Sequence, residues 1–306
     1  MQLKEGKTMK KKINVAIIGL GFGSEFIPIY QKHPSANMYA ICRRTKNKLD
    51  EIGDAFNIEK RYTDLNELLK DDNIDAVHIN SPIHNHASQT IAALKAGKHV
   101  ACTVPMGTNV KECKEIVENQ KASGKKYMMM ETSVYTREFL YVKELLETGK
   151  LGKIQFVRAA HHQEMAGWPG YWEGLPPMHY ATHCVGPCLA LEQKNAEYVS
   201  CFGSGRIAES LVSKHNSPFA IETCHIKMKN TDLCAEITRS LFNTAREYVE
   251  SFDVYGEKQT YEWQQLERED PVLFTGEKGE RVKVPDYAHL LPEPIRSETD
   301  ASSFLR

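Results

Sequence analysis

The sequence predicts a two-domain α/β protein: a doubly wound parallel sheet, followed by an α+β domain built on a large, mostly antiparallel sheet. Three observations support this fold class. Over roughly the first 125 residues, apolar strand patterns alternate with helix patterns, which requires parallel strands joined by helical crossovers. A glycine-rich turn follows the first strand. Beyond about residue 150, strand patterns are separated by turn signals such as KNTD and GEKG.

The parallel sheet is expected within residues 11–130. INVAIIG is a continuous apolar run, typical of a strand that is buried on both faces. Pro34 is expected to stop the first helix, Asp64 to cap a later one, and Gly97 and Gly124 to end two more. The expected strands are INVAIIG (13–19), MYAIC (38–42), RYT (61–63), DAVHINS (75–81), HVACTV (99–104) and KYMMMET (126–132).

The second domain is expected to occupy residues 131–306. REFLYVKELLETGKLG predicts a helix that is closed by glycines. The end SETDASSFLR has no helix or strand pattern, which favours a domain that is truncated at its C-terminus. The expected strands are IQFVRAA (154–160), YVSCFGS (198–204), FAIETCHIKM (219–228), LCAEITRSLF (233–242), YVESFDVYG (248–256), QTYEWQQ (259–265) and RVKVP (281–285).

The net charge and the cysteine content limit which binding partners and which cellular compartment are expected for this chain. The 39 basic and 40 acidic residues give a formal charge of −1, so no long-range field attracts nucleic acid or an anionic membrane. No apolar run approaches the roughly 18 residues that would span a bilayer. The eight cysteines are scattered and form no CxxC pair, which predicts reduced thiols in a cytoplasmic protein.

The turn GLGFGS predicts a dinucleotide site. It follows a buried strand and opens a helix, where glycines allow a tight turn and a close approach of the backbone to a pyrophosphate. The expected contacts are Gly19, Gly21, Phe22, Gly23 and Ser24, the last in place of a third glycine. The alternative is a bare structural turn.

Arg43 and Arg44 end the second strand, where NAD-binding proteins carry an acid for the ribose hydroxyl. Two arginines suit the 2′-phosphate of NADP. Two solvated arginines are an equally acceptable interpretation, so the choice between NAD and NADP stays open.

The stretches GLGFGSEF, INSPIHNHA, AALKAGKHVAC and GKLGKI together resemble the Gfo/Idh/MocA family, that of glucose–fructose oxidoreductase and inositol dehydrogenase. The resemblance implies that Asn80, Ser81, Pro82 and His86 line the nicotinamide half of the cofactor site. The alternative for Pro82 and His86 is a loop turn with a capping imidazole.

One motif of this family is changed at its central residue. Most members carry E-K-P after the fifth strand, where the lysine contacts the substrate hydroxyl and the nicotinamide. This chain has Thr103, Val104 and Pro105 at those positions. They are expected beside the cofactor, but a valine cannot relay a proton, so the usual mechanism is in doubt.

PPMHYATHCVGPC, residues 176–188, supplies the proton-handling candidates. Within the family it is most similar to the NAD-dependent glycosidases, including α-N-acetylgalactosaminidases, which read Y-P-T-H-G-L-G-P. The segment KYMMMETSVYTRE also resembles these enzymes, whereas HHQEM (161–165) does not reproduce their tyrosine-containing segment. The resemblance implies proton transfer by His183, Tyr180 and His179, with Glu131 beside the cofactor as support.

The loop EMAGWPGYWEGLPP offers aromatic faces to a sugar. Trp168, Tyr171, Trp172 and Tyr135 are the expected substrate contacts. A self-packed loop or a subunit contact is the alternative.

A metal site is not expected. His179 and His183 lie four residues apart, as two zinc ligands on a helix do, but His162, Glu164 or a cysteine would have to complete the set. Neither HExxH nor paired CxxC is present, and Cys184 and Cys188 suit a buried helix face.

These features favour an NAD(P)-dependent oxidoreductase that transfers hydride to or from a sugar or sugar derivative. One alternative is a glycosidase that uses transient oxidation and elimination. Another is a non-catalytic cofactor-binding protein, motivated by Val104 and His179. The resemblance also implies a homo-oligomer, a dimer or tetramer, formed through the C-terminal sheet.

Overall fold

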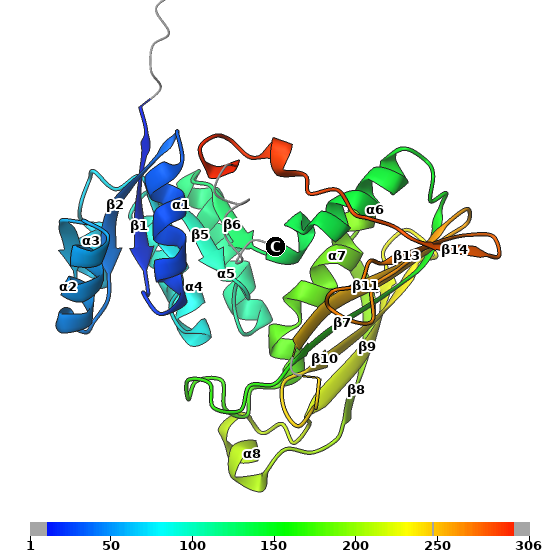
Figure 1. The fold of residues 1–306 in the computed structure, drawn as a ribbon. Helices are drawn as coiled ribbons and strands as arrows, with labels where there is room; N and C mark the ends of the chain where they lie inside the picture. The colour runs from blue at the N-terminus through cyan, green and yellow to red at the C-terminus, as the bar shows by residue number, and fades with distance from the viewer. Residues whose placement is uncertain (1–10, 247, 297–306) are drawn as a thin grey trace, which may run out of the picture. The chain divides into compact units, whose positions relative to one another are not determined.

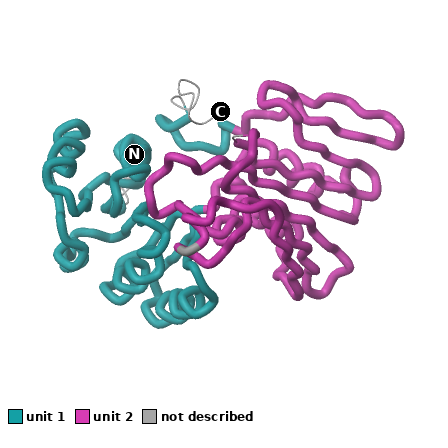
Figure 2. Tube along the Cα trace, turned by 90° about the horizontal axis from the view of Figure 1, so that it is seen from below, with its two compact units in different colours: residues 1–130, 288–306 teal, residues 131–287 magenta. Residues whose placement is uncertain are grey.

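A computed structural model describes residues 11–246 and 248–296 (Figure 1). By its internal contacts the chain divides into two compact units (Figure 2). Unit 1 comprises the chain up to Met130 together with the segment from Ala288 onward, and unit 2 comprises Glu131–Tyr287. The segment SETDASSFLR, residues 297–306, lies outside the described residues.

Unit 1 is a doubly wound parallel sheet, as predicted. Its six strands lie in the order β3-β2-β1-β4-β5-β6. Its strands are β1 Ile13–Ile18, β2 Ala36–Cys42, β3 Lys60–Tyr62, β4 Ala76–Ile79, β5 His99–Thr103 and β6 Tyr127–Met130. Its helices are η1 Phe22–Phe26, α1 Ile27–Lys32, α2 Lys46–Ala55, α3 Leu65–Leu69, η2 Ile83–Asn85, α4 His86–Lys95, α5 Val110–Ser123 and η5 Ala288–Leu290.

The continuous apolar run of β1 is explained by burial on both faces. Ile17 packs into one core cluster with Leu49 of α2, while Ala16 and Ile18 pack into a second cluster with Leu94 of α4. The predicted cap at Asp64 is confirmed, because its carboxylate accepts from the backbone N–H groups of the following helix turn at 2.8 and 3.1 Å. These layers hold the ends of β1, β2, β4 and β5 at one edge of the sheet.

Unit 2 is an eight-stranded sheet in the order β14-β13-β12-β11-β7-β10-β9-β8, antiparallel except for the pair β7 and β10. Its strands are β7 Ile154–Gln163, β8 Ala196–Ser204, β9 Ile221–Met228, β10 Cys234–Ser240, β11 Tyr248–Gly256, β12 Thr260–Glu262, β13 Val272–Thr275 and β14 Lys278–Arg281. Its helices are η3 Thr132–Tyr135, α6 Arg137–Glu147, η4 Pro177–Tyr180, α7 Thr182–Glu192 and α8 Glu209–His215.

In the last hairpin of unit 2, one strand boundary differs from the prediction. RVKVP was expected as a strand over residues 281–285, but β14 ends at Arg281 and pairs with β13, which was not foreseen. The reason is a two-residue turn at Gly276 (φ +62°), across which Thr275 pairs with Lys278. The turn was correctly expected at GEKG, but the strand begins two residues after this glycine.

One apolar core joins α6 and α7 to one face of the large sheet (Figure 1). Phe139 of α6 and the thiols of Cys184 and Cys188 on α7 pack against strand residues such as Ile237 and Val254. The interpretation of these two cysteines as packing groups is therefore supported, and all eight cysteines are free thiols. Within residues 11–246 and 248–296, no helix combines the length and the apolar character needed to cross a membrane.

Candidate functional site

The glycine turn of unit 1 leaves open space above its backbone. Gly19 adopts φ +89°, and a Cβ there would lie 2.7 Å from the backbone of Asn80 and Ser81, so only glycine fits between the ends of β1 and β4. A Cβ on Gly21 would meet nothing within 4 Å, and Ser24 turns its Oγ back to the Gly21 carbonyl at 3.1 Å. Phe22 is exposed. This open turn can receive a pyrophosphate at the carboxyl edge of the sheet.

Asn80 provides an independent sign of a ligand at the same edge. Its side-chain Oδ1 and Nδ2 are both buried, and neither has a hydrogen-bond partner among the described residues. A Cβ added at Gly23 would lie 3.0 Å from the Asn80 side chain, so the amide stands against the glycine turn. Buried polar atoms are usually satisfied, and a bound dinucleotide would supply the missing partners.

Arg43 and Arg44 follow β2 at this edge. Arg43 is half-buried and Arg44 is exposed. Neither guanidinium forms an ion pair with a carboxylate of the described chain, although such pairs are common elsewhere on the surface. Both charges therefore remain available to a ribose or a 2′-phosphate.

The loops after β4 and β5 are tied together by His86. Its ring lies between the carbonyl oxygens of Ser81 (2.8 Å) and Pro105 (2.7 Å). Burial lowers the pKa of His86, so the neutral ring donates to one of the two carbonyls. These contacts are those of a residue that joins loops. Thr103 donates to the Ile79 carbonyl at 3.1 Å, and Val104 is buried. Ser81 and Pro82 are half-buried at the start of the η2 turn.

In unit 2, His183 and Glu131 form a buried pair. His183 Nδ1 donates to Glu131 Oε1 at 2.6 Å, and the same oxygen accepts from the Ser133 backbone N–H at 3.0 Å. Glu131 caps η3, and His183 lies in the first turn of α7. A Cβ at Gly186 would lie 2.9 Å from the Glu131 side chain, so glycine in GPC lets α7 approach this carboxylate. Glu131 thus belongs with the proton-handling candidates.

The pair is ionised more readily than its burial alone would permit. Burial lowers the pKa of His183, but the hydrogen bond to Glu131 and the charge of Glu250 outweigh it and raise the pKa overall. Burial likewise raises the pKa of Glu131, while the hydrogen bond and charge of His183 lower it below its ordinary value. An imidazole held in this way accepts a proton at Nε2 while Nδ1–H stays on the carboxylate.

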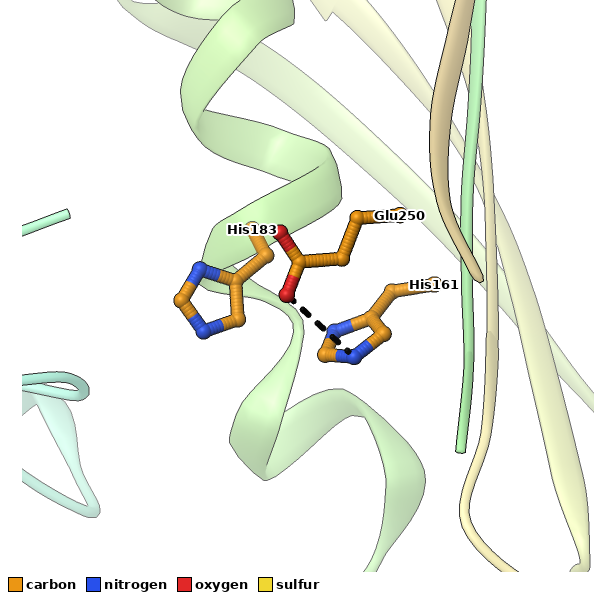
Figure 3. Close-up of side chains that lie close together, drawn as sticks. All are labelled: His161, His183 and Glu250. Carbon is orange, nitrogen blue, oxygen red and sulfur yellow. Dashed lines mark ion pairs between the residues drawn. The ribbon is translucent and has the colours of Figure 1, made fainter. Parts of the chain in front are cut away.

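Three adjacent strands place polar residues beside His183. In the sheet register, His161 of β7 lies opposite Arg239 of β10 on one side and Glu250 of β11 on the other. The His161 ring is 5.1 Å from the His183 ring, and its Nε2 is 3.8 Å from Glu250 Oε1. Figure 3 shows the side chains of His161, His183 and Glu250 close together, with the ion pair between His161 and Glu250 marked.

Arg239 is a buried hydrogen-bond donor to several residues around this cluster. Its fully buried guanidinium donates to the carbonyls of Tyr180, His161 and Ser240 at 2.6–2.9 Å and to the side-chain oxygen of Gln163 at 2.9 Å. Burial lowers the pKa of Arg239 to about 10, so the group remains charged at neutral pH.

Tyr180 connects the cluster to the aromatic loop. Its hydroxyl lies 3.3 Å from His183 Nε2, and burial raises its pKa, so it stays a neutral donor. Its ring is 4.9 Å from Trp172, which in turn contacts Tyr171 at 5.5 Å and Trp168 at 6.2 Å. Trp172 is buried, while Trp168 and Tyr171 are exposed. Two aromatic side chains of the series that leads to Tyr180 are thus exposed to solvent.

Two predicted site residues lie apart from the cluster. His179 is exposed and, after burial, contributes to lowering the pKa of His215 of α8. Tyr135, in η3, is also exposed. The structure brings together His183, Tyr180, Glu131 and Trp172 of the predicted set.

The sequence analysis missed His161, Arg239 and Glu250. Period-two alternation could have found them, because each continues a row of inward apolar residues along its strand. The rows are Val157, Ala159 and His161; Ala235, Ile237 and Arg239; and Val254, Phe252 and Glu250. A charged or polar group that continues a buried apolar row on three strands indicates a site.

The open glycine turn and the unpartnered Asn80 amide at the carboxyl edge of the doubly wound sheet are features of a dinucleotide-binding unit. Residues 13–131 match the family described as "Oxidoreductase family, NAD-binding Rossmann fold". The N-terminal part of the chain thus matches the Gfo/Idh/MocA family, which bears out the resemblance of its motifs.

Relatives of this chain include glycosyl hydrolases and a dehydrogenase. A glycosyl hydrolase family 109 protein of Shewanella baltica is 28% identical over 255 residues, which cover 75% of this chain and 56% of the relative. An α-N-acetylgalactosaminidase of Shewanella oneidensis is 27% identical with the same coverage. The chain thus spans little more than half the length of these relatives. The myo-inositol 2-dehydrogenase of Thermotoga maritima is 24% identical over 281 residues, covering 88% of this chain and 80% of that protein.

A solved structure supports the fold. An NAD-binding oxidoreductase from Klebsiella pneumoniae superimposes with a TM-score of 0.77 at 20% identity, covering 96% of this chain and 84% of that one. The predicted succession of a parallel sheet and a mostly antiparallel sheet is confirmed by this likeness.

Proposed function

We propose that the protein is an NAD(P)-dependent oxidoreductase that acts on a hydroxyl-bearing carbon of a sugar or sugar derivative. The observation that carries this proposal is the buried pair of Glu131 and His183, whose Nε2 lies by the Tyr180 hydroxyl and can exchange a proton with a substrate hydroxyl. The nicotinamide, when bound, supplies the hydride acceptor. Alcohol oxidation also releases one proton, which this imidazole is placed to accept.

Each residue of the cluster has a distinct task in this proposal. His183 takes the hydroxyl proton at Nε2, and Glu131 stabilises the resulting imidazolium through the 2.6 Å hydrogen bond at Nδ1. Tyr180 donates its hydroxyl toward the same nitrogen and positions the substrate oxygen. A proton acceptor of this kind typically contributes about 10²–10⁴-fold in rate, which compensates for the missing amine at Val104.

Carbohydrate is the substrate class that the surroundings favour. Trp168 and Tyr171 expose flat faces within the aromatic series that leads to Tyr180. Such faces suit the C–H surface of a pyranose ring. Myo-inositol 2-dehydrogenase and the family 109 glycosyl hydrolases act, by their names, on polyhydroxylated rings or glycosides.

A redox-assisted glycosidase is the second candidate. The identity of 28% to a family 109 protein over 75% of the chain favours it, as does the motif from Tyr180 to Pro187. Oxidation at one ring carbon would acidify the neighbouring C–H, so that the aglycone leaves by elimination and hydride returns after water adds. The cofactor is then unchanged over a full cycle.

Two assays distinguish these candidates from a non-catalytic protein. Net NAD(P)H formation with free sugars indicates the dehydrogenase, and aglycone release from nitrophenyl glycosides without net NAD(P)H indicates the glycosidase. Cofactor binding with neither activity would refute both. The variant His183→Asn should lose at least about 100-fold in kcat, whereas the exposed His225→Ala control should retain full activity.

A further inference from the structure

His161, His183 and Glu250 form a compact set of metal-ligating side chains inside unit 2. One donor atom from each lies within 4.8 Å of the others, and they come from β7, α7 and β11 (Figure 3). Both imidazoles are buried, and Glu250 is half-buried. Two ring nitrogens and a carboxylate oxygen are the donors that zinc prefers in catalytic sites.

His161 is the least satisfied member of the set. It is 1% exposed, and neither of its ring nitrogens has a hydrogen-bond partner among the described residues. Its Nε2 faces Glu250 Oε1 at 3.8 Å, beyond hydrogen-bond distance. A buried imidazole without partners requires an explanation, and a bound cation supplies one.

His183 is oriented as metal-ligating histidines are. Its Nδ1 donates to Glu131 at 2.6 Å, which fixes the ring and leaves the lone pair on Nε2. Carboxylate–histidine–metal arrangements of this type hold the tautomer and increase the basicity of the ligand nitrogen. Glu250 is held in turn by the hydroxyl of Tyr248.

The charge balance of the cluster favours a cation. Glu131 and Glu250 contribute two negative charges, and Arg239 contributes one positive charge. With both imidazoles unprotonated, the state in which they would ligate a metal, the sum is −1. The guanidinium of Arg239 is directed to backbone carbonyls and to Gln163, so it does not neutralise either carboxylate by a direct contact.

We propose that His161, His183 and Glu250 bind one divalent transition metal, with zinc best suited to the donor set. Zinc at about 2.1 Å from each donor would draw the donors to roughly 3.4 Å from one another. With three protein ligands, a fourth position stays open to water or a substrate oxygen. With the metal bound, His183 is a ligand and no longer the proton acceptor. The cation would then lower the pKa of a bound substrate hydroxyl, whose proton passes to solvent; this catalytic consequence alone rests on the proposed function.

Metal titration of the full chain tests the site directly. Protein freed of metal with a chelator is titrated with ZnCl₂ by calorimetry, and with Co²⁺ while its visible absorption is followed. We expect one equivalent to bind and a Co²⁺ spectrum of low coordination number without thiolate charge transfer. Glu250→Gln and His161→Asn should each weaken binding at least about tenfold, and Glu131→Gln by roughly 10–100-fold. His225→Ala, an exposed histidine of β9, should bind as the parent does.

Circular dichroism and urea unfolding of each variant show that it is folded. Failure of the folded parent to bind one equivalent would overturn the proposal. So would a stoichiometric site that persists in both Glu250→Gln and His161→Asn, or a thiolate spectrum. The titrations contain neither sugar nor cofactor. NADH binding and sugar turnover, followed separately, therefore show whether the proposed function fails on its own.

Discussion

Replacing Glu131 by glutamine should lower the pKa of His183. In the parent, the carboxylate lies 2.6 Å from Nδ1 and favours the imidazolium. A hydrogen bond to a charged group contributes about 1.5–3 kcal/mol. At 1.36 kcal/mol per pKa unit, losing this preference corresponds to a decrease of about 1–2 units. Glutamine keeps an acceptor oxygen, so the lower part of that range is expected.

Nuclear magnetic resonance of imidazole-labelled protein measures this pKa without knowledge of the substrate. Metal is removed first, and the resonance of His183 is identified by its loss in His183→Asn. Glu197→Gln serves as the matched control, because Glu197 is an exposed glutamate on β8 of the same unit. It should leave the titration unchanged.

The same shift should be visible in catalysis. If unprotonated His183 accepts the substrate proton, kcat/KM increases with pH through the pKa of His183. In Glu131→Gln this acidic limb should move to lower pH, while the maximal rate decreases because the imidazolium is less stabilised. A His183 pKa that is unchanged or higher in Glu131→Gln would refute the assignment of Glu131 as its partner.

Four further results are expected. Gly19→Ala should lower the free energy of unfolding in urea by about 1–3 kcal/mol, because its Cβ would lie 2.7 Å from backbone atoms. The same variant should lose NADH binding, measured by fluorescence. Gly276→Ala, at φ +62° with open space around it, should be destabilised less and should bind NADH normally. Arg44→Ala should weaken NADPH more than NADH in fluorescence titrations, and equal weakening would argue against contact with a 2′-phosphate. Cys201, the one exposed thiol among the eight, should react first with a thiol reagent, and Cys201→Ser should remove that fast phase. The lowered pKa of Glu131 stabilises the folded protein, and this contribution is lost as the pH falls through the pKa of Glu131 in the folded state. The raised pKa of His183 also stabilises the folded protein, and this contribution is lost as the pH rises through the pKa of His183 in the folded state. Urea unfolding should therefore show the largest deficit of Glu131→Gln between these two pKa values.

Local patterns were sufficient to predict unit 1. INVAIIG is apolar on both faces because two helical layers cover β1, and the glycines of GLGFGS mark a turn that no other residue fits at Gly19. These signals lie within a few residues of one another, so they need no knowledge of long-range contacts. The succession of strands in unit 2 could be predicted from equally local patterns, except where the hairpin at Gly276 sets the register of β13 and β14.

The site of unit 2 was only partly visible in the sequence. His183 and Tyr180 share a short motif, whereas Glu131 is 52 residues from its partner and His161 and Arg239 are 78 residues apart. Which side chains meet depends on the order β11-β7-β10, a long-range property of the sheet that strand patterns do not reveal. His179 was chosen by motif position, yet it lies on the exposed side of η4 near His215.

Reduction of bound nicotinamide by sugars tests the central proposal most directly. Cofactor-loaded protein, with and without added Zn²⁺, is mixed rapidly with a panel of sugars and glycosides while reduced-nicotinamide absorbance is followed. We expect that absorbance to rise in the parent with at least one sugar, transiently for a glycosidase, and to stay flat in His183→Asn that still binds cofactor. No reduction with any sugar, or equal reduction in His183→Asn, would contradict the proposal.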